Sequence, residues 1–444
     1  MNILLIGSGA REHAIARAIK KSKTNSSLFC FGSNNNPGIS KISAGYTVGK
    51  MDDVEDILNF ATNNKIDITI IGPEAPLASG LADLLWKNDI PCVGPKQKHA
   101  QLESSKAFTR DLFEEFNIPG GAKHKNFNSL EEVEEFLNEL GEGNYVVKAD
   151  GLMGGKGVKV AGDHLKDIKE ALEYCEELIE KNSAFVIEEK FIGQEFSLMS
   201  FCDGEHLAHM PIVQDHKRAF EGDTGPNTGG MGTYSDANHS LPFLTDEDLK
   251  KAQEINIATA KALKTKFGEG YKGILYGGFI ATKNGVSLIE YNARLGDPEA
   301  MNVLSILKSD FVDLCLAIIK GNLTQEHAQF LEKATVCKYA VPEGYPDSPI
   351  KNQKIDIAEV SNPEQLFLAS VDERPDGLYE AGSRTAAFVG IADTIEEAEI
   401  IAETEITKIK GPLFHRKDIG TKELIEKRIE MMHSIRPSGL SSPT

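Results

Sequence analysis

The sequence predicts a multidomain protein of mixed α/β and α+β class, with a Rossmann-like parallel sheet at its N-terminal end. Three observations support this prediction. The chain has 444 residues, which is enough for two to four domains. Short apolar runs alternate with helical periodicity over the first part of the chain. Further along, two pairs of apolar runs flank the turn sequences Asp203-Gly204 and Asn284-Gly285.

Four apolar runs near the N-terminus are expected to be strands, and each ends at a glycine. They cover residues 2–6, 28–31, 68–71 and 92–93, ahead of Gly7, Gly32, Gly72 and Gly94. Helical periodicity fills the gaps between them. This alternation is typical of a doubly wound parallel sheet, whose ligands bind at the carboxyl ends of the strands.

The rest of the chain predicts a different arrangement, with antiparallel hairpins. Asp-Gly and Asn-Gly suit type I′ turns, which predicts that 195–202 pairs with 206–213, and 274–282 with 286–291. The other expected elements are a helix from 104 with a turn at 118–121, strands over 145–148, 158–161 and 185–189, helices over 164–181 and within 297–320, a strand-rich unit from 330, and a disordered tail over 434–444.

Charge and composition exclude several classes of function. Lys and Arg number 48 against 67 Asp and Glu, so the net charge is −19, which argues against nucleic acid as a partner. The sequence has no C-x-x-C, H-E-x-x-H or G-x-S-x-G motif, so a redox pair, a metalloprotease and a serine hydrolase are all disfavoured. No apolar run approaches the ~18 residues of a membrane span. We expect a cytoplasmic protein without a membrane partner.

A glycine-rich loop lies between two expected strands at 150–157. Its glycines allow close approach to phosphates, and Lys148 and Lys156 supply positive charge. The sequence is not a P-loop motif. It predicts either a hairpin lid over nucleotide phosphates or a merely flexible hairpin, and the two alternatives are equally supported.

The segment Gly7-Ser-Gly-Ala-Arg-Glu12 is similar to a dinucleotide-binding fingerprint, but Glu12 replaces the third glycine. A tight strand-to-helix turn explains it at least as well as NAD binding. Binding of a substrate phosphate at the helix N-terminus remains open.

Two further segments carry candidate site residues. Glu290, Asn292 and Arg294 share one face of a strand if the strand continues, and a carboxylate with an amide oxygen suits Mg²⁺. Spacing alone favours a solvated strand face. The charged run 214–218 enters a loop over 222–232 that contains five glycines, and a loop over an active site is the better interpretation.

Together these segments resemble the glycinamide ribonucleotide synthetases of the ATP-grasp superfamily. The matching stretches occur in the family's order over roughly residues 1–420: 7–13, 36–38, 72–77, 148–151 with 155–157, 215–218, 225–232, 290–294 with 296–299, and 416–420. Each stretch is weak evidence, whereas the ordered set is highly specific. The resemblance implies a Rossmann-like domain over 1–103, an ATP-grasp domain over 104–328 with a mobile lid at about 122–192, a C-terminal domain over 329–423, and a helix end and tail over 424–444.

The resemblance also implies roles for individual residues. Those expected to bind ATP are Lys106, Lys148, Gly154, Gly155, Lys156, Gly157, Glu188, Glu189, Lys190 and Glu195. Mg²⁺ or Mn²⁺ would be held by Glu290 and Asn292. The expected substrate-binding residues are Gly9, Asn36, Pro37, Gly38, Glu74, Asn227, Thr228 and Gly229, and the expected catalytic residues are Asp215, Lys217 and Arg294.

The reaction implied by the resemblance is the ATP-dependent ligation of glycine to 5-phosphoribosylamine in purine biosynthesis. It proceeds through glycyl phosphate and gives glycinamide ribonucleotide, ADP and phosphate. No protein nucleophile is needed. Asp215 is expected to orient the attacking amine and, as a second role, to remove a proton from that amine. Members of the family are generally monomers.

Two alternatives stay open, and four places in the sequence depart from the family pattern. The alternatives are another ATP-grasp enzyme, such as a carboxylase, and a regulatory protein that binds nucleotide without turnover. The glycine-rich loop has Met153-Gly154 where the family usually has two alanines before Gly-Lys, and Asp236 follows Ser235 where the family commonly has a proline. The stretch Ala381–Arg384 differs from the usual Ser-Gly-Gly-Arg, so Arg384 is carried over only weakly. Gly278 stands where many ATP-grasp enzymes have a further metal ligand, which leaves the number of metal ions open.

Overall fold

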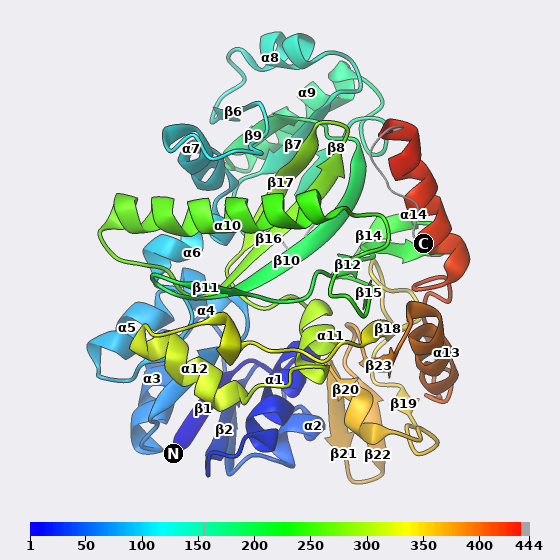
Figure 1. The fold of residues 1–444 in the computed structure, drawn as a ribbon. Coiled ribbons are helices and arrows are strands. Elements are labelled where there is room, and N and C mark those ends of the chain that lie inside the picture. The colour runs from blue at the N-terminus through cyan, green and yellow to red at the C-terminus, as the bar shows by residue number, and fades with distance from the viewer. Residues whose placement is uncertain (154–156, 437–444) are drawn as a thin grey trace.

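A computed structural model of the chain describes residues 1–153 and 157–436. Its N-terminal part is a five-stranded, fully parallel sheet in the order β3-β2-β1-β4-β5 (Figure 1). The strands are β1 (Asn2–Ile6), β2 (Ser27–Gly32), β3 (Gly45–Val48), β4 (Ile68–Ile71) and β5 (Cys92–Val93). The parallel sheet is confirmed, and the added strand β3 has no buried residue, which is why no apolar run predicts it.

Six helices accompany this sheet: α1 (Ala10–Lys21), α2 (Pro37–Ser40), α3 (Val54–Asn63), α4 (Glu74–Ala78), α5 (Leu81–Lys87) and α6 (Gln97–Ser104). The helix α7 (Lys106–Glu115) follows α6 directly, with Ser105 as its N-cap. The Ser105 hydroxyl accepts a hydrogen bond from the Phe108 amide at 3.1 Å. This cap explains why the helical segment divides at this residue.

A small antiparallel sheet in the order β6-β9-β7-β8 forms a separate lobe. Its elements are β6 (His124–Phe127), α8 (Val133–Leu140), β7 (Tyr145–Ala149), β8 (Val158–Val160), α9 (Ile168–Glu180) and β9 (Phe185–Glu189). The helix expected from 164 begins at Ile168 because Asp167 caps it, accepting from the Glu170 amide at 2.9 Å. The lobe has its own hydrophobic core, built around Phe127, Val147 and Phe185.

The central sheet is antiparallel, in the order β11-β10-β16-β17, and the long helix α10 (Asp246–Phe267) runs across it (Figure 1). Its strands are β10 (Gly193–Asp203), β11 (Leu207–His209), β16 (Lys272–Thr282) and β17 (Gly285–Asn292). Both hairpins form at the expected turns. The partner of β10 is shorter than expected because Pro211, which has no N–H, follows β11.

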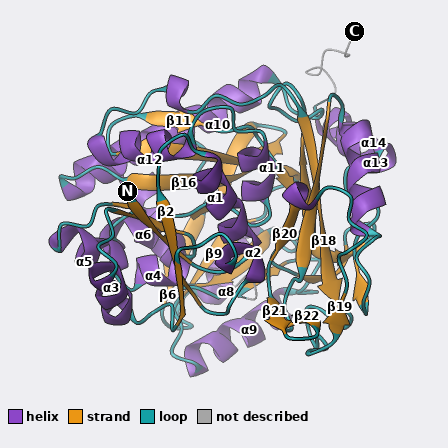
Figure 2. Ribbon diagram, turned by 90° about the horizontal axis from the view of Figure 1, so that it is seen from below, coloured by secondary structure: helices purple, strands orange, loops and turns teal. Residues whose placement is uncertain are grey.

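The C-terminal sheet, in the order β12-β15-β18-β23-β20, combines strands from two distant parts of the chain. The strands β12 (Gln214–Asp215) and β15 (Gly232–Ser235) come from the middle, and β18 (Ala334–Pro342), β20 (Leu366–Leu368) and β23 (Ala386–Ala392) from the end. The connection between β12 and β15 contains a separate two-stranded hairpin, β13 (Arg218–Phe220) with β14 (Thr224–Asn227). Figure 2 shows α13 (Ile395–Ile406) beside β18, and α14 (Lys422–Ile435) packs against β10.

The remaining elements are α11 (Glu299–Ser305), α12 (Phe311–Lys320), the 3-10 helices η1 (Gln325–His327) and η2 (Pro363–Gln365), β24 (Leu413–Phe414), and a small sheet of β19 (Lys354–Ile355), β22 (Gly377–Glu380) and β21 (Val371–Arg374). The tail expected to be disordered from Ser434 is instead helical through Ile435, and Arg436 donates to Asp248 at 2.9 Å. Residues 437–444 lie outside the described residues. None of the helices among residues 1–153 and 157–436 is long and apolar enough to cross a membrane.

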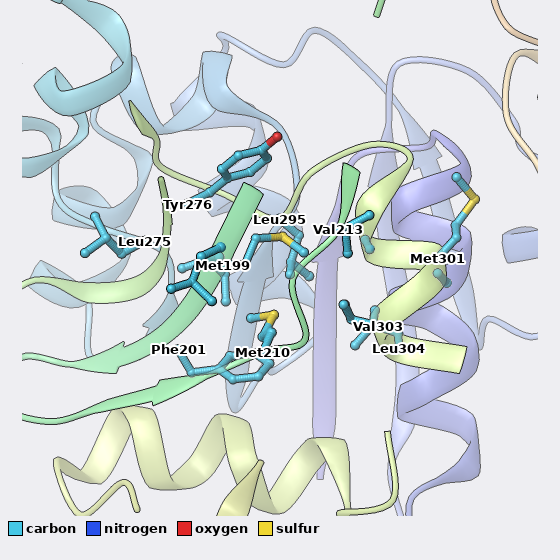
Figure 3. Packing of buried hydrophobic residues seen from close by; sticks show 14 of the residues in the cluster. Met199, Phe201, Met210, Val213, Leu275, Tyr276, Leu295, Met301, Val303 and Leu304 are labelled. Atoms are coloured by element: carbon cyan, nitrogen blue, oxygen red, sulfur yellow. The ribbon is translucent and has the colours of Figure 1, made fainter. Parts of the chain in front are cut away.

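The largest hydrophobic core joins the central sheet to the elements beneath it. Figure 3 shows Met199 and Phe201 of β10 packing in the same region as Met301, Val303 and Leu304 of α11. The same cluster of buried residues extends into β1, β18 and β23. The parts of the chain that carry the candidate site residues therefore rest on shared packing.

Leu198 of β10 is fully buried in this core, whereas Ile257 on α10 is 49% exposed. We expect Leu198→Ala to lower the free energy of unfolding by about 2–5 kcal/mol, because it removes buried methyl groups and leaves a cavity. Ile257→Ala should change it by less than about 0.5 kcal/mol. Denaturant unfolding of both variants checks this, and equal losses would contradict the assignment of Leu198 to the core.

Candidate active site

Three elements that are distant in sequence meet at the end of the central sheet. Lys217 follows β12, and its Nζ lies 3.3 Å from Oε1 of Glu290 on β17 and 3.9 Å from Oε2 of Glu195 on β10. The Glu290 carboxylate raises the pKa of Lys217, and Lys217 in turn lowers the pKa of Glu290 to about 2. Both groups therefore carry charge at neutral pH.

Arg294 lies just beyond β17 and turns back toward it. Its Nη2 donates to Oδ1 of Asn292 at 3.1 Å and lies 3.0 Å from Oε1 of Glu103, and its Nε lies 3.4 Å from Oε2 of Glu74. Burial opposes the charge on Arg294, but Glu103 and Glu74 outweigh it and raise its pKa. The expected residues Asn292, Arg294 and Glu74 thus come together.

Glu103 is a member of this cluster that the sequence does not predict. It lies on α6, and its Oε2 accepts a hydrogen bond from the Ala293 amide at 2.8 Å. Burial, above all, raises the pKa of this carboxyl. No motif marks Glu103, because its partner Arg294 lies far away in the sequence.

A second cluster links the small lobe to the central sheet. Glu188 of β9 receives two hydrogen bonds from Arg110 of α7, each 2.7 Å long, and its Oε2 lies 2.8 Å from Nζ of Lys148. The side chains of Arg110 and Lys148 also donate to the carbonyl of Ile289 on β17, at 2.9 and 3.1 Å. All three charged side chains are buried. Arg110 is therefore a further residue near the candidate site that no sequence motif indicates.

The pKa values of this cluster follow from burial and pairing. Burial is the strongest influence on the pKa of Glu188 and would raise it, but Arg110 and Lys148 together outweigh it and lower the pKa to about 2. Burial lowers the pKa of Lys148.

Both carboxylate oxygens of Glu188 already have partners, namely Arg110 and Lys148. The amides of Glu189 and Lys190 are also used, since they donate to the carbonyls of Lys123 and Asn144 at 2.9 Å each.

The start of α7 faces the glycine-rich loop. The Asp150 carboxylate accepts from the Lys106 amide at 2.6 Å, and Nζ of Lys106 donates to the Gly151 carbonyl at 2.9 Å. Gly157 accepts from the Ala149 amide at 2.8 Å. The expected ATP-binding residues Gly154, Gly155 and Lys156 lie outside the described residues.

Asp215 and the glycine-rich segment after β14 lie side by side. A side chain at Gly230 would come within 2.7 Å of Oδ1 of Asp215, so this approach requires glycine. Burial, followed by the charge of Glu299, raises the pKa of Asp215 well above its usual range. Asn227 pairs with Arg218 across the hairpin.

Thr228 connects this segment to Lys217. Its amide and its hydroxyl both donate to the Lys217 carbonyl, at 2.7 and 2.8 Å, and its hydroxyl accepts from the Gly230 amide at 3.0 Å. The structure thereby brings together Asp215, Lys217, Thr228 and Gly229, which are separated by a hairpin in the sequence.

Arg384, which the sequence supports only weakly, lies directly beneath this segment. It donates to the carbonyls of Gly229, Gly230 and Asp297 at 2.6, 3.0 and 2.9 Å, and its guanidinium lies over the ring of Tyr339. The divergent stretch around Arg384 therefore still places an arginine against Gly229 and Gly230.

The segment Asn36-Pro37-Gly38 is used mainly for packing. Asn36 is fully buried, donates to the carbonyls of Ser8 and Leu368 at 2.9 and 2.7 Å, and accepts from the Gly38 amide at 2.9 Å. A side chain at Gly38 would come within 2.1 Å of the His13 ring. Both residues thus hold α2 against α1 and β20, and a role in substrate binding remains a prediction.

Glu12 fills the N-terminus of α1. Its carboxylate accepts from the Gly9 amide at 2.7 Å and from Nε of Arg11 at 2.6 Å. The position of the third glycine in a dinucleotide fingerprint is therefore taken by a carboxylate that repels phosphate. This favours the tight structural turn over NAD or phosphate binding at α1, and it occupies the amide of Gly9, one of the expected substrate-binding residues.

Glu290 and Asn292 offer a metal one ionised carboxylate oxygen and one amide oxygen, which are ligands that Mg²⁺ and Mn²⁺ accept. Gly278 of β16 stands opposite Glu290 and adds no side chain there. Within residues 1–153 and 157–436, no group of three His, Cys, Asp or Glu side chains could hold a metal ion by itself. The two oxygens suit such a cation by their chemistry, and in this structure Lys217 and Arg294 pair with them.

Comparison with known proteins gives the family. Models of the phosphoribosylglycinamide synthetase N domain, ATP-grasp (A) domain and C domain match residues 1–103, 104–300 and 335–422. Proteins named phosphoribosylamine–glycine ligase from Methanosarcina barkeri and Methanocaldococcus jannaschii are 49% and 51% identical over 436 and 445 residues, and each alignment covers 98% of this chain and 100% of the relative. The solved phosphoribosylamine–glycine ligase of Thermotoga maritima superposes with a TM-score of 0.80 at 28% identity, covering 94% of this chain and 100% of that one. Because these matches extend over most of its length, the chain belongs to the phosphoribosylglycinamide synthetase family.

Proposed function

We propose that the chain ligates glycine to 5-phosphoribosylamine at the expense of ATP, giving glycinamide ribonucleotide, ADP and phosphate in purine biosynthesis. The observation that carries this proposal is the match of the whole chain to relatives named phosphoribosylamine–glycine ligase. The meeting of Lys217, Glu290 and Arg294 supports it, because the reaction needs several charges close to phosphate and carboxylate groups.

The proposed chemistry has two steps. A carboxylate oxygen of glycine attacks the γ-phosphorus of ATP, so that ADP leaves and glycyl phosphate forms. The amine nitrogen of phosphoribosylamine then attacks the glycyl carbonyl carbon, phosphate leaves, and the amine loses a proton. In both steps the protein acts by positioning reactants and neutralising charge.

The residues around the central sheet support a division of roles. We assign Lys106 and Lys148 to the ATP phosphates, Glu195 to the ribose, and the backbone carbonyls of Glu188 to Lys190 to the adenine, since the amides of the last two donate elsewhere. Gly154, Gly155, Lys156 and Gly157 are assigned to the phosphates on the sequence alone. Mg²⁺ or Mn²⁺ at Glu290 and Asn292 would neutralise phosphate charge.

The acceptor side is assigned to the residues around the β13–β14 hairpin. Asp215 would orient the amine and accept its proton, and Lys217 and Arg294 would neutralise the carboxylate and phosphate of the reactants. The remaining proposed contacts are Asn227, Thr228 and Gly229 on the hairpin side and Gly9, Asn36, Pro37, Gly38 and Glu74 on the Rossmann-like side. Burial of Asp215 supports the role of a base, because a raised pKa makes its carboxylate more basic.

The assay that tests this function measures ADP release from Mg-ATP by the purified chain, with glycine and freshly generated phosphoribosylamine, each omitted in turn. ADP formation that requires both co-substrates is expected. Turnover with bicarbonate in place of glycine would favour a carboxylase, and ATP binding without turnover would favour a regulatory protein.

We expect Asp215→Asn to lower kcat by roughly 10²- to 10⁴-fold, the usual contribution of a general base. Because a base must be deprotonated and the pKa of Asp215 is raised, the wild-type rate should fall as the pH drops through that raised pKa. The variant should lack this acid limb. A pH profile of kcat/KM checks it, with exposed Asp246→Asn as the control; an unchanged profile in Asp215→Asn would rule out the base.

We expect Glu290→Gln to weaken the binding of Mn²⁺ in the presence of ATP at least about tenfold, because even outer partners of metal ligands change affinity by this much. Titration of Mn²⁺ followed by electron paramagnetic resonance gives a readout that is independent of turnover. Glu254→Gln on α10 is the matched control. Equal Mn²⁺ affinity in both variants would remove Glu290 from the metal site.

We propose the domain division 1–103, 104–328, 329–423 and 424–444, with residues of about 122–192 acting as a lid over ATP. The separate core of this lobe supports independent movement. Amide hydrogen exchange of β6, β7 and β9 should slow when ATP is added, while β18 stays unchanged as an internal reference. Equal protection with and without ATP would count against a lid.

A further inference from the structure

Arg416 is one of the largest fully buried side chains of the chain, and the motif that contains it, 416–420, has no role in the proposed chemistry. Its Nη1 donates to the Arg218 carbonyl at 3.1 Å and to Oδ1 of Asp223 at 3.0 Å. Its Nε and Nη2 donate to the Asp418 carboxylate at 2.9 and 2.7 Å. One buried guanidinium thus joins β13, the turn of the β13–β14 hairpin and the segment before α14.

The turn of the hairpin is held by further charged contacts. Asp223 also pairs with Arg428 of α14, and Oδ2 of Asp418 accepts from the Gly222 amide at 3.0 Å. Asp223 has a φ of 56°, in the left-handed region that few residues other than glycine adopt. Figure 1 shows α14 running beside β14, on the side of the molecule where these contacts lie. We call Asp223, Arg416, Asp418 and Arg428 the hairpin clamp.

The base of the hairpin is held by His216. This residue lies between Asp215 and Lys217 in the sequence, and its side chain is buried. Its amide donates to the Gly232 carbonyl at 3.0 Å, and its carbonyl accepts from the Met231 amide at 2.8 Å. Burial, followed by the charges of Arg416 and Arg428, lowers the pKa of His216 to about 3, so the ring is neutral at physiological pH. Arg416 and Arg428 of the clamp therefore lie near enough to the His216 ring to lower its pKa.

A clamp is needed because the hairpin has little support of its own. The strands β13 and β14 pair only with each other among the described strands, and a two-stranded hairpin is marginally stable at best in water. The segments on either side of it carry the acceptor-side residues, since Lys217 precedes β13 and Thr228 follows β14. A shift of the hairpin would move Nζ of Lys217 away from Glu290.

We infer that the hairpin clamp positions the β13–β14 hairpin, and through it Lys217 and the segment 227–229, for the reaction of the acceptor substrate. This inference rests on the proposed function for its kinetic consequence and on the contacts alone for its structural one. Asp223, Arg416, Asp418 and Arg428 are positioning residues, because they act through the hairpin.

The test uses two conservative variants of the full chain, Arg416→Lys and Asp223→Asn. A lysine keeps the charge but cannot make the forked contacts, and an asparagine keeps the shape but removes the charge. Arg436→Lys is the matched control. Nη1 of Arg436 donates to both carboxylate oxygens of Asp248 at 2.9 Å each, so Arg436 holds the end of α14 against α10 without touching the hairpin.

Two measurements separate positioning from stability. We expect amide hydrogen exchange over 218–227 to become faster in both clamp variants and to stay unchanged in Arg436→Lys. We also expect kcat/KM for phosphoribosylamine to fall about 10- to 100-fold in the clamp variants with the KM for ATP unchanged, because a small misplacement of reacting groups can cost this much.

Unchanged exchange over 218–227 in both clamp variants would overturn the inference, as would a kinetic loss that equals that of Arg436→Lys or that affects ATP and phosphoribosylamine alike. If one clamp variant fails to fold, the other still decides. If the wild-type chain does not turn over these substrates, the proposed function fails, and the hydrogen-exchange result alone decides whether the clamp holds the hairpin.

Discussion

The contact between Lys217 and Glu290 is the constraint on which the candidate site depends. It joins a segment of the C-terminal sheet to the last strand of the central sheet, at the place where Asn292 and Arg294 also lie. Both charges are held in their ionised forms by each other. The pair therefore fixes the position of a positive and a negative charge beside Asn292 and Arg294.

Most of the fold could be predicted from periodicity and turn sequences. The parallel strands β1, β2, β4 and β5 appear as apolar runs, and the two hairpins follow from Asp203-Gly204 and Asn284-Gly285. The strand β3 could not be predicted in this way, because no residue in it is buried. The composition of the C-terminal sheet was also hidden, since the pairing of β15 with β18 joins residues about a hundred positions apart.

The residues of the candidate site also differ in how far the sequence predicts them. Glu290, Asn292, Lys217 and Thr228 lie in motifs, and the structure brings them close together. Glu103 and Arg110 have no motif, because their roles come from contacts with Arg294 and Glu188 that only the folded chain creates. In the opposite direction, motif residues such as Asn36 and Gly38 have clear packing partners, so a motif by itself did not distinguish binding from packing.

The pairing of β15 with β18 has a consequence for how this architecture can be divided. The strand β15 belongs to the same connection as Asp215 and Lys217, yet its hydrogen-bonding partner lies in the last quarter of the chain. Removing everything after residue 333 would leave β15 with an open edge, of the kind that pairs with foreign strands and leads to aggregation. The C-terminal part is thus not a separate module, because it completes a sheet whose first two strands come from the middle of the chain. A truncation or gene fusion that separates β15 from β18 would expose an edge of that sheet.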